Sequence, residues 1–132
     1  MFVDCPVSLG ELIDKITILT IKERKIQDSA KLKNIIKEKD LLQKKLLELN
    51  LLGIEVFIDQ LIEVNEKLWD IEDGIRQKEF EQDFGKSFIE LARSVYKTND
   101  KRFSIKNRIN REYDSDIAEE KSYKEYYSVN CL

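Results

Sequence analysis

The sequence contains no histidine, a single proline, four glycines and two cysteines. Without histidine, a Cys–His nucleophile and a Ser–His–Asp triad are excluded. Cys5 and Cys131 stand near opposite ends of the 132 residues, and this spacing makes neither a zinc motif nor a disulfide framework. The scarcity of proline and glycine leaves few points at which a helix has to break.

An excess of one charge sign and long apolar runs are also missing. The chain has 23 basic and 26 acidic residues, a net charge of -3, so any contact with nucleic acid or anionic lipid would have to be local. No apolar run approaches the roughly 20 residues that span a bilayer, and the first residues do not resemble a secretion signal. We therefore expect a cytoplasmic protein without membrane association, and we do not expect it to bind nucleic acid.

Lysine, glutamate, leucine and isoleucine dominate the composition, as they do in long helices. Ser8 and Glu11 have the spacing of a capping box, and apolar residues recur at helical spacing from there to Asp28. Asn50 and Gly53 favour the left-handed conformation that ends a helix. The pattern predicts helices over about residues 8–27, 29–50, 54–78 and 84–112.

Short connections between helices of this length favour antiparallel neighbours, so we predict one all-α domain over 1–132, an antiparallel four-helix bundle. Residues 113–132 follow the last helix without a clean period. We predict an irregular or short-helical tail there, packed across the bundle by its aromatic side chains. These are Tyr113, Tyr123, Tyr126 and Tyr127.

Two helix-period stripes, on the third and fourth predicted helices, turn polar where a stripe that faces a core should stay apolar. A buried ion without a partner costs several kcal/mol, so such side chains must pair with one another, line a wet cleft or hold a ligand. The polar members of the two stripes are Asn65, Glu72, Asn99, Arg102 and Lys106.

The register of these two helices follows from the turn near Gln82, because residues whose numbers sum to about 164 then lie at the same height. Asn65 is level with Asn99. Arg102 and Lys106 are level with the start of the first helix, which carries two acidic residues. The predicted cluster therefore comprises Glu11, Asp14, Asn65, Asn99, Arg102 and Lys106.

This cluster has two interpretations, which the sequence leaves open. In the first, ion pairs and an Asn–Asn hydrogen bond fix the helix register of a non-enzymatic binding or interaction module, as a homodimer or with another protein partner. In the second, Arg102 and Lys106 neutralise a phosphate or carboxylate that the asparagines orient. The second protein would bind a small anionic ligand, and its function could extend to magnesium-dependent hydrolysis of nucleotide-type substrates.

Glu72 is a second candidate, apart from the cluster and beside Leu68 and Trp69. Burial would raise its pKa and suit it to proton transfer. Arg76, one turn further on, or Arg93 would instead pair with it and keep it ionised. We predict the pairing for Glu72 and a packing role for Trp69.

Four carboxylates, Glu63, Glu66, Asp70 and Asp73, follow one another at helical spacing. They are offset by about 200° from the apolar stripe, which points them to solvent, so we expect no metal site and no other cofactor. The Glu63-x-x-Glu66 pair resembles the first half of the Glu-x-x-Glu … Glu-x-x-Asp pattern of all-α nucleoside triphosphate pyrophosphohydrolases, but the second half is missing. The segment 101–111 is locally basic and contains Phe103, a combination that could form a nucleic-acid or phosphate patch. We prefer another cause, because the segment lies at a predicted helix C-terminus, where cations complement the helix dipole.

Four blocks of sequence together resemble a family of short bacterial proteins without an established activity. The blocks are PVSLGELIDKITIL (6–19), NEKLWDIEDGIR (65–76), LARSVYKTNDKRFSIKNRIN (91–110) and EEKSY (119–123). The resemblance spans most of the chain and implies a cytoplasmic bacterial protein of unknown role. It transfers no catalytic or binding residue.

Overall fold

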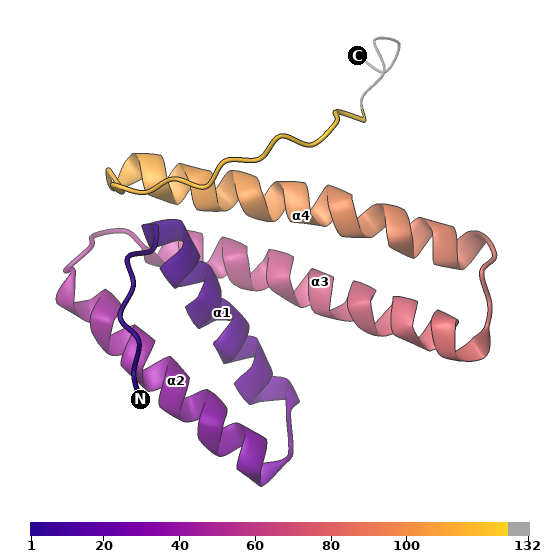
Figure 1. Cartoon of the computed structure of the whole chain (residues 1–132), viewed down its shortest axis with the longest axis horizontal. Helices are drawn as coiled ribbons and strands as arrows, with labels where there is room; N and C mark the ends of the chain where they lie inside the picture. The colour runs from indigo at the N-terminus through magenta and orange to yellow at the C-terminus, as the bar shows by residue number, and fades with distance from the viewer. Residues whose placement is uncertain (127–132) are drawn as a thin grey trace.

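The structure, a computed structural model, describes residues 1–126, which contain four helices and no strand (Figure 1). The all-α prediction is confirmed, and every predicted helix end lies within three residues of the observed one. Tyr127 and Cys131 lie outside the described residues. The helices are α1 (Leu9–Lys25), α2 (Ser29–Glu48), α3 (Glu55–Glu81) and α4 (Lys86–Glu112).

Side chains cap the starts of α1 and α2, whereas α3 and α4 begin without a side-chain cap. Ser8 Oγ accepts a hydrogen bond from the Glu11 N–H at 3.1 Å, so the serine half of the predicted capping box is formed. The glutamate half is not formed, because the Glu11 carboxylate binds Lys106 of α4 instead. Asp28 caps α2 by accepting from the Lys31 N–H at 2.9 Å.

Residues in the left-handed conformation lie in the connections that follow α2 and α3. Asn50 (φ 49°) and Gly53 (φ 75°) turn the chain after α2, as predicted. After α3 the left-handed residue is Gln82 (φ 55°), so the helix continues three residues beyond the predicted end. The polar stretch 79–81 consists of two glutamates and a phenylalanine, which a helix accommodates, so only residues 82–85 form the turn.

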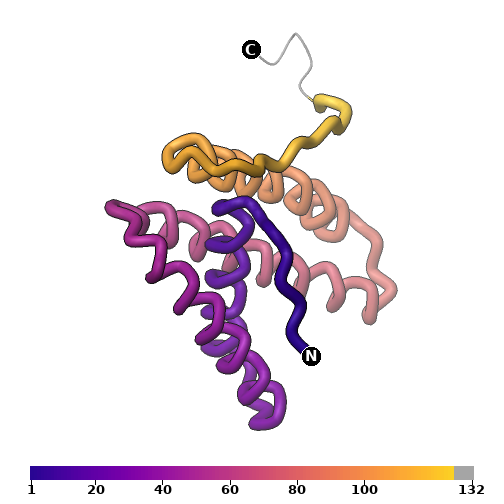
Figure 2. Tube along the Cα trace, turned by 60° about the vertical axis from the view of Figure 1, so that its left-hand side comes forward, coloured from indigo at the N-terminus to yellow at the C-terminus, as the bar shows by residue number. Residues whose placement is uncertain are grey.

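The helices form two antiparallel hairpins, α1–α2 and α3–α4, which are inclined to each other (Figures 1 and 2). α1 packs against all three other helices, whereas α2 approaches only α1 closely. α1 comes very near α4 at Gly10, where an added Cβ would lie 2.6 Å from the Lys106 carbonyl oxygen. Figure 1 shows that α1 then leaves α4 while α3 and α4 continue side by side.

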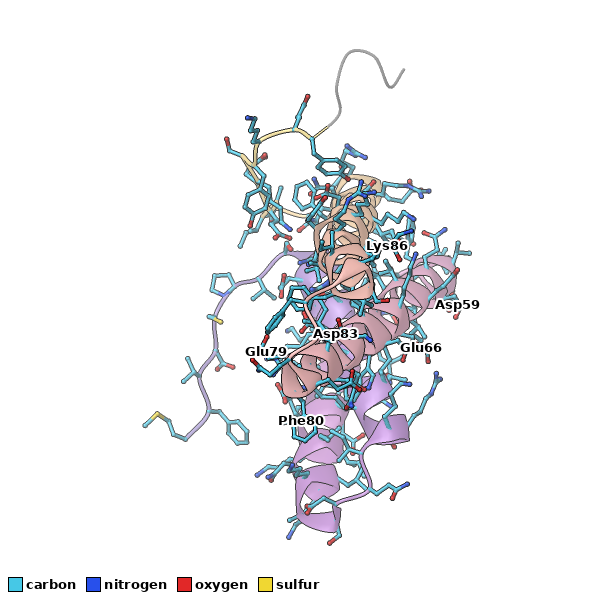
Figure 3. All side chains as sticks on the ribbon, turned by 90° about the vertical axis from the view of Figure 1, so that its right-hand side faces the viewer. Asp59, Glu66, Glu79, Phe80, Asp83 and Lys86 are labelled. Atoms are coloured by element: carbon cyan, nitrogen blue, oxygen red, sulfur yellow. The ribbon has the colours of Figure 1, made fainter. Side chains whose placement is uncertain are left out.

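The core lies where the two hairpins meet, and all four helices contribute to it. Ile13 of α1, Leu46 of α2, Leu61 of α3 and Ile109 of α4 belong to one buried apolar cluster. The far end of the α3–α4 hairpin extends beyond α1 and α2, and there the large side chain of Phe80 is exposed. Figure 3 looks onto this end and labels Glu79, Phe80, Asp83 and Lys86 around the turn.

The predicted register of α3 and α4 is confirmed by two contacts. A Cβ built on Gly74 would lie 3.3 Å from both methyl carbons of Leu91. Nearer the other end of the hairpin, the Arg108 guanidinium lies 5.5 Å from the centre of the Phe57 ring. Both pairs sum to 165, against the predicted value of about 164.

Residues 113–126 form an irregular tail that follows α4 (Figure 1). The Tyr113 hydroxyl donates to the Leu52 carbonyl oxygen at 2.6 Å. The Tyr126 ring meets the Tyr96 ring edge to face, with ring centres 5.0 Å apart. Tyr123, in contrast, is exposed. Aromatic packing of the tail is therefore confirmed at Tyr113, whose ring meets that of Phe57, and at Tyr126, and it is wrong at Tyr123. Within residues 1–126, no helix has both the length and the apolar character of a membrane span.

Candidate functional site

Asp14, on the buried face of α1, is the centre of the polar cluster and is only 1% exposed. Arg102 Nε donates to Asp14 Oδ1 at 3.0 Å and to Asp14 Oδ2 at 3.1 Å, and Arg102 Nη2 donates to Asp14 Oδ2. Asn65 Nδ2 donates to Oδ1 at 2.9 Å. The hydrogen bonds that Arg102 donates to Asp14 raise the pKa of Arg102, although its partial burial opposes the shift. The predicted Asp14–Arg102 association is present, and its geometry holds the guanidinium in one orientation.

The predicted hydrogen bond between Asn65 and Asn99 is not formed. Asn65 Nδ2 donates to Thr17 Oγ1 at 3.0 Å as well as to Asp14. The Thr17 hydroxyl in turn donates to the Asp14 carbonyl oxygen at 2.7 Å. The α1 residues thus occupy the Asn65 amide nitrogen and leave Asn99 outside the network.

Lys106 is the centre of a second, closed part of the cluster, and its side chain is 6% exposed. Its Nζ lies 2.7 Å from Glu11, 2.8 Å from Glu119 and 4.0 Å from Asp14. Burial is the largest single influence on the pKa of Lys106 and lowers it, but the three carboxylates together raise that pKa above its ordinary value of 10.5. This part of the cluster has the geometry of a structural ion-pair network.

The space beside Asp14 opens into a groove of about 420 Å³. We call it the α1–α3–α4 groove, because residues of these three helices line it. Its lining residues are Ile18, Ile21, Lys22, Asn65, Leu68, Trp69, Glu72, Asp73, Asn99 and Arg102.

The polar groups of the α1–α3–α4 groove differ in sign from one wall to the other. Lys22 of α1 and Arg102 of α4 supply positive charge, while Glu72 and Asp73 of α3 supply negative charge. Within residues 1–126, the side chains of Lys22 and Asn99 have no hydrogen-bond or ion-pair partner, and Arg102 Nη1 donates to none. The groove therefore presents three unused polar groups to whatever occupies it.

The predicted site residues thus separate into two groups. Glu11, Asp14 and Lys106 take part in ion pairs with one another, with Arg102 or with Glu119, and of these three only Glu11, with 47% of its side chain exposed, is open to solvent. The other group, which lines the groove, comprises Asn65, Asn99, Arg102 and Glu72.

Glu72 lies outside the ion pairs of the cluster, and it lines the same groove as Asn65 and Arg102, which the sequence did not predict. Its side chain is 51% exposed, so the burial considered for it does not occur. The predicted pairing is present, with Arg76 Nε 3.8 Å from Glu72 Oε2. Trp69 has more than the predicted packing role, since it also lines the groove, with Lys25 Nζ 6.0 Å from its ring centre.

Sequence reasoning missed Lys22, Glu119 and Asn110. Lys22 lies beside the stripe of α1 and interrupts no apolar pattern, so periodicity gives no signal for it. Glu119 lies in the irregular tail, where periodicity carries no information. Asn110 is buried and accepts a hydrogen bond from the Gly10 N–H at 2.7 Å. Its position one residue after Ile109, in a helix already identified, was the available signal.

The carboxylate stripe on α3 faces solvent or pairs with α1. Glu63, Asp70 and Asp73 are exposed, while Glu66 lies 3.5 Å from Arg24. Figure 3 shows Asp59 and Glu66 along one flank of α3. In the part of the chain that the structure describes, no three acidic or cysteine side chains gather as a metal ion would require.

The helix-dipole explanation of the basic segment 101–111 is wrong for all its cations but one. Only Arg111 stands in the last turn of α4, where the dipole acts. Arg102 and Lys106 turn inward to the acidic residues of α1, and Arg108 lies over an aromatic ring. Lys101 lies on another face of the helix, beside Lys97 and Asp100.

Comparison with known proteins assigns the family. A family model described as a family of unknown function, DUF6165, matches residues 3–131. The chain belongs to this family. No curated protein and no solved structure matches it significantly. Because the DUF6165 description carries no activity, the function has to be argued from the α1–α3–α4 groove.

Proposed function

We propose that this DUF6165 protein is a non-enzymatic binding module and that the α1–α3–α4 groove holds a small ligand with a phosphate or carboxylate group. One observation carries the proposal. Lys22, Asn99 and Arg102 all line the groove, and within residues 1–126 the side chains of Lys22 and Asn99 and the Arg102 Nη1 have no partner. Polar groups that a fold does not use internally, gathered in a concave site, are typical of ligand sites.

Arg102 and Lys22 have different roles in this proposal. The charge of Arg102 is balanced by Asp14 behind it, so the guanidinium contributes an oriented donor more than net charge. Lys22 has no such acid, and it supplies the positive charge that attracts the anion. Asn99 then orients the anionic group by a hydrogen bond, as expected from the sequence.

The remainder of the ligand faces α3. Glu72 and Asp73 accept hydrogen bonds, so this end of the groove favours hydroxyl or amino groups. Leu68 and Trp69 give the same wall an apolar surface. A phosphorylated or carboxylated metabolite with polar hydrogens and an apolar or ring portion, such as a nucleotide or sugar phosphate, matches this combination.

The proposal concerns binding, and we attach no hydrolytic step to the groove. The magnesium-dependent hydrolysis of nucleotide-type substrates considered from the sequence gains no support from the carboxylates of α3, because within residues 1–126 no three acidic or cysteine side chains gather as a metal ion would require. We retain the predictions of a bacterial, cytoplasmic protein that forms a homodimer or binds another protein partner.

A thermal-shift screen tests the proposal. Purified protein is heated with inorganic phosphate, nucleotides, sugar phosphates and small carboxylic acids, each with and without magnesium. A ligand at 100 times its dissociation constant adds about 2.7 kcal/mol to the free energy of unfolding, which is a clear rise in melting temperature. We expect at least one of these compounds to give such a rise.

Variants locate the site of binding. Lys22→Met and Asn99→Leu each remove one unused polar group and are expected to abolish the shift while the protein stays folded. Lys33→Met, on the exposed face of α2, removes the same charge away from the groove and should keep the full shift. A flat screen, or an equal loss in all three variants, contradicts the proposal.

A further inference from the structure

A second groove, of about 670 Å³, lies on the side of α4 away from α1. Arg102 follows Arg93 by nine residues, which places the two on opposite sides of a helix with 3.6 residues per turn. We call this second site the basic groove. It is lined mainly by Arg93, Tyr96, Lys97, Asp100, Lys101 and Tyr126.

Three cations form a row along the basic groove. Arg93, Lys97 and Lys101 follow at intervals of four residues, so they lie one above the other about 6 Å apart along the helix. None of the three forms an ion pair within residues 1–126, and Asp100 is the one acidic lining residue found there. The dipole of α4 does not account for them, because even Lys101 precedes the helix end by about three turns.

Aromatic side chains stand beside this row. Tyr96 is exposed, and its ring meets that of Tyr126, from the tail, at 5.0 Å. A further tail cation, Lys121, has its Nζ 5.0 Å from the centre of the Phe103 ring of α4. The tail therefore supplies one wall of the basic groove through Tyr126 and places a further cation, Lys121, against α4.

We propose that the basic groove binds single-stranded nucleic acid. The row of cations faces a repeating negative charge, as the phosphates of an extended strand present, and the Tyr96 ring offers a surface on which a base stacks. A bilayer surface fits less well, because the site is concave and no aliphatic side chain lines it. The near-neutral composition argued against nucleic acid only for the chain as a whole, whereas this charge is local.

Fluorescence anisotropy with a fluorescein-labelled ten-residue oligouridylate tests the proposal on the full chain at low salt. We expect saturable binding that weakens as salt rises. The slope of log K against log salt is expected to be about -2, since each neutralised phosphate of a single strand contributes about -0.7. A slope near zero, or no binding at low salt, overturns the proposal.

Two charge variants localise the contact. Arg93→Gln/Lys97→Gln/Lys101→Gln is expected to weaken binding at least tenfold. Lys31→Gln/Lys33→Gln/Lys44→Gln removes three exposed cations of α2 and should change it less than twofold. An equal loss in both variants means non-specific attraction and overturns the proposal. Circular dichroism checks that each variant is folded, and the first variant keeps any ligand shift that arises in the α1–α3–α4 groove.

Tyr96 distinguishes nucleic acid from other polyanions. Tyr96→Ala is expected to weaken binding about fivefold or more through lost stacking, and Tyr96→Phe should retain it. Inorganic polyphosphate is expected to compete much less well than unlabelled oligouridylate at equal phosphate concentration. Equal competition, or preferential binding to phosphatidylglycerol vesicles, overturns the proposal.

Discussion

Asp14 is a buried acidic side chain of α1 that forms several hydrogen bonds to other helices. Its carboxylate accepts from Arg102 and Asn65, and both of its oxygens are occupied. A carboxylate removed from water keeps its charge only when such partners replace its hydration. The position of Asp14 on a buried helix face is therefore tied to Arg102, and neither residue is expected to tolerate loss of the other.

Replacing one member of this pair should be more damaging than replacing both. Asp14→Ala leaves the Arg102 guanidinium without its partner and is expected to lower the free energy of unfolding by about 3–5 kcal/mol. The double variant Asp14→Leu/Arg102→Met removes both charges and should recover most of this loss. Urea unfolding followed by circular dichroism measures both values. The single variants Asp14→Leu and Arg102→Met complete the comparison, and a double variant whose loss equals the sum of their losses would argue against the pairing.

Lys106 should make the stability depend on alkaline pH. Its pKa is raised in the folded protein, so its ion pairs contribute fully below the unfolded value of about 10.5. The contribution is lost as the pH rises through the higher folded pKa, where the ammonium loses its proton. The difference in unfolding free energy between wild type and Lys106→Met should stay constant up to about pH 10 and shrink above pH 10.5. A difference that persists unchanged to pH 11.5 contradicts this role.

At the scale of the helices, the crossing of α1 and α4 depends on a residue without a side chain. Gly10 brings the α1 backbone against the Lys106 carbonyl oxygen and donates its N–H to Asn110. The α1–α3–α4 groove lies beyond this crossing, because α1 is held close to α4 here and then diverges from it (Figure 1).

Adding one methyl group at this crossing should move the helix. Gly10→Ala is expected to destabilise the protein by about 1–3 kcal/mol, although alanine has the higher helix propensity, because the contact is with backbone. Gly74→Ala is the matched control. Its new Cβ would meet only the movable methyl groups of Leu91, at 3.3 Å, so the loss should be smaller or absent. Melting temperatures compare the two, and a Gly10→Ala protein as stable as wild type would exclude the close crossing.

At the scale of the molecule, the helix ends and the α3–α4 register could be predicted because they depend on neighbours in sequence. Ser8, Asp28 and Gly53 act within a few residues of where they stand. The tight turn after Gln82 then fixes the pairing of two long helices. The prediction that Asp14 meets Arg102 followed from that register.

The inclination between the two hairpins could not be predicted in this way, because it depends on how closely α1 can approach α4. The sequence identified Gly10 only as a glycine, not as the point of contact. Without the inclination, neither the common groove of Glu72 and Arg102 nor the presence of Lys22 in its wall could be predicted. The contribution of Glu119 was equally hidden, since an irregular tail has no period from which a direction follows.

The links between α1 and α4 also have a consequence for the order in which the chain becomes stable. Arg102 follows Asp14 by 88 residues, and Lys106 follows Glu11 by 95. During synthesis, the α1–α2 hairpin therefore emerges long before the cation that neutralises its buried acid. Contacts so distant in sequence form late and slow folding. We accordingly expect the α1–α2 hairpin to remain only marginally stable, with Asp14 hydrated, until α4 has been synthesised and packs against it.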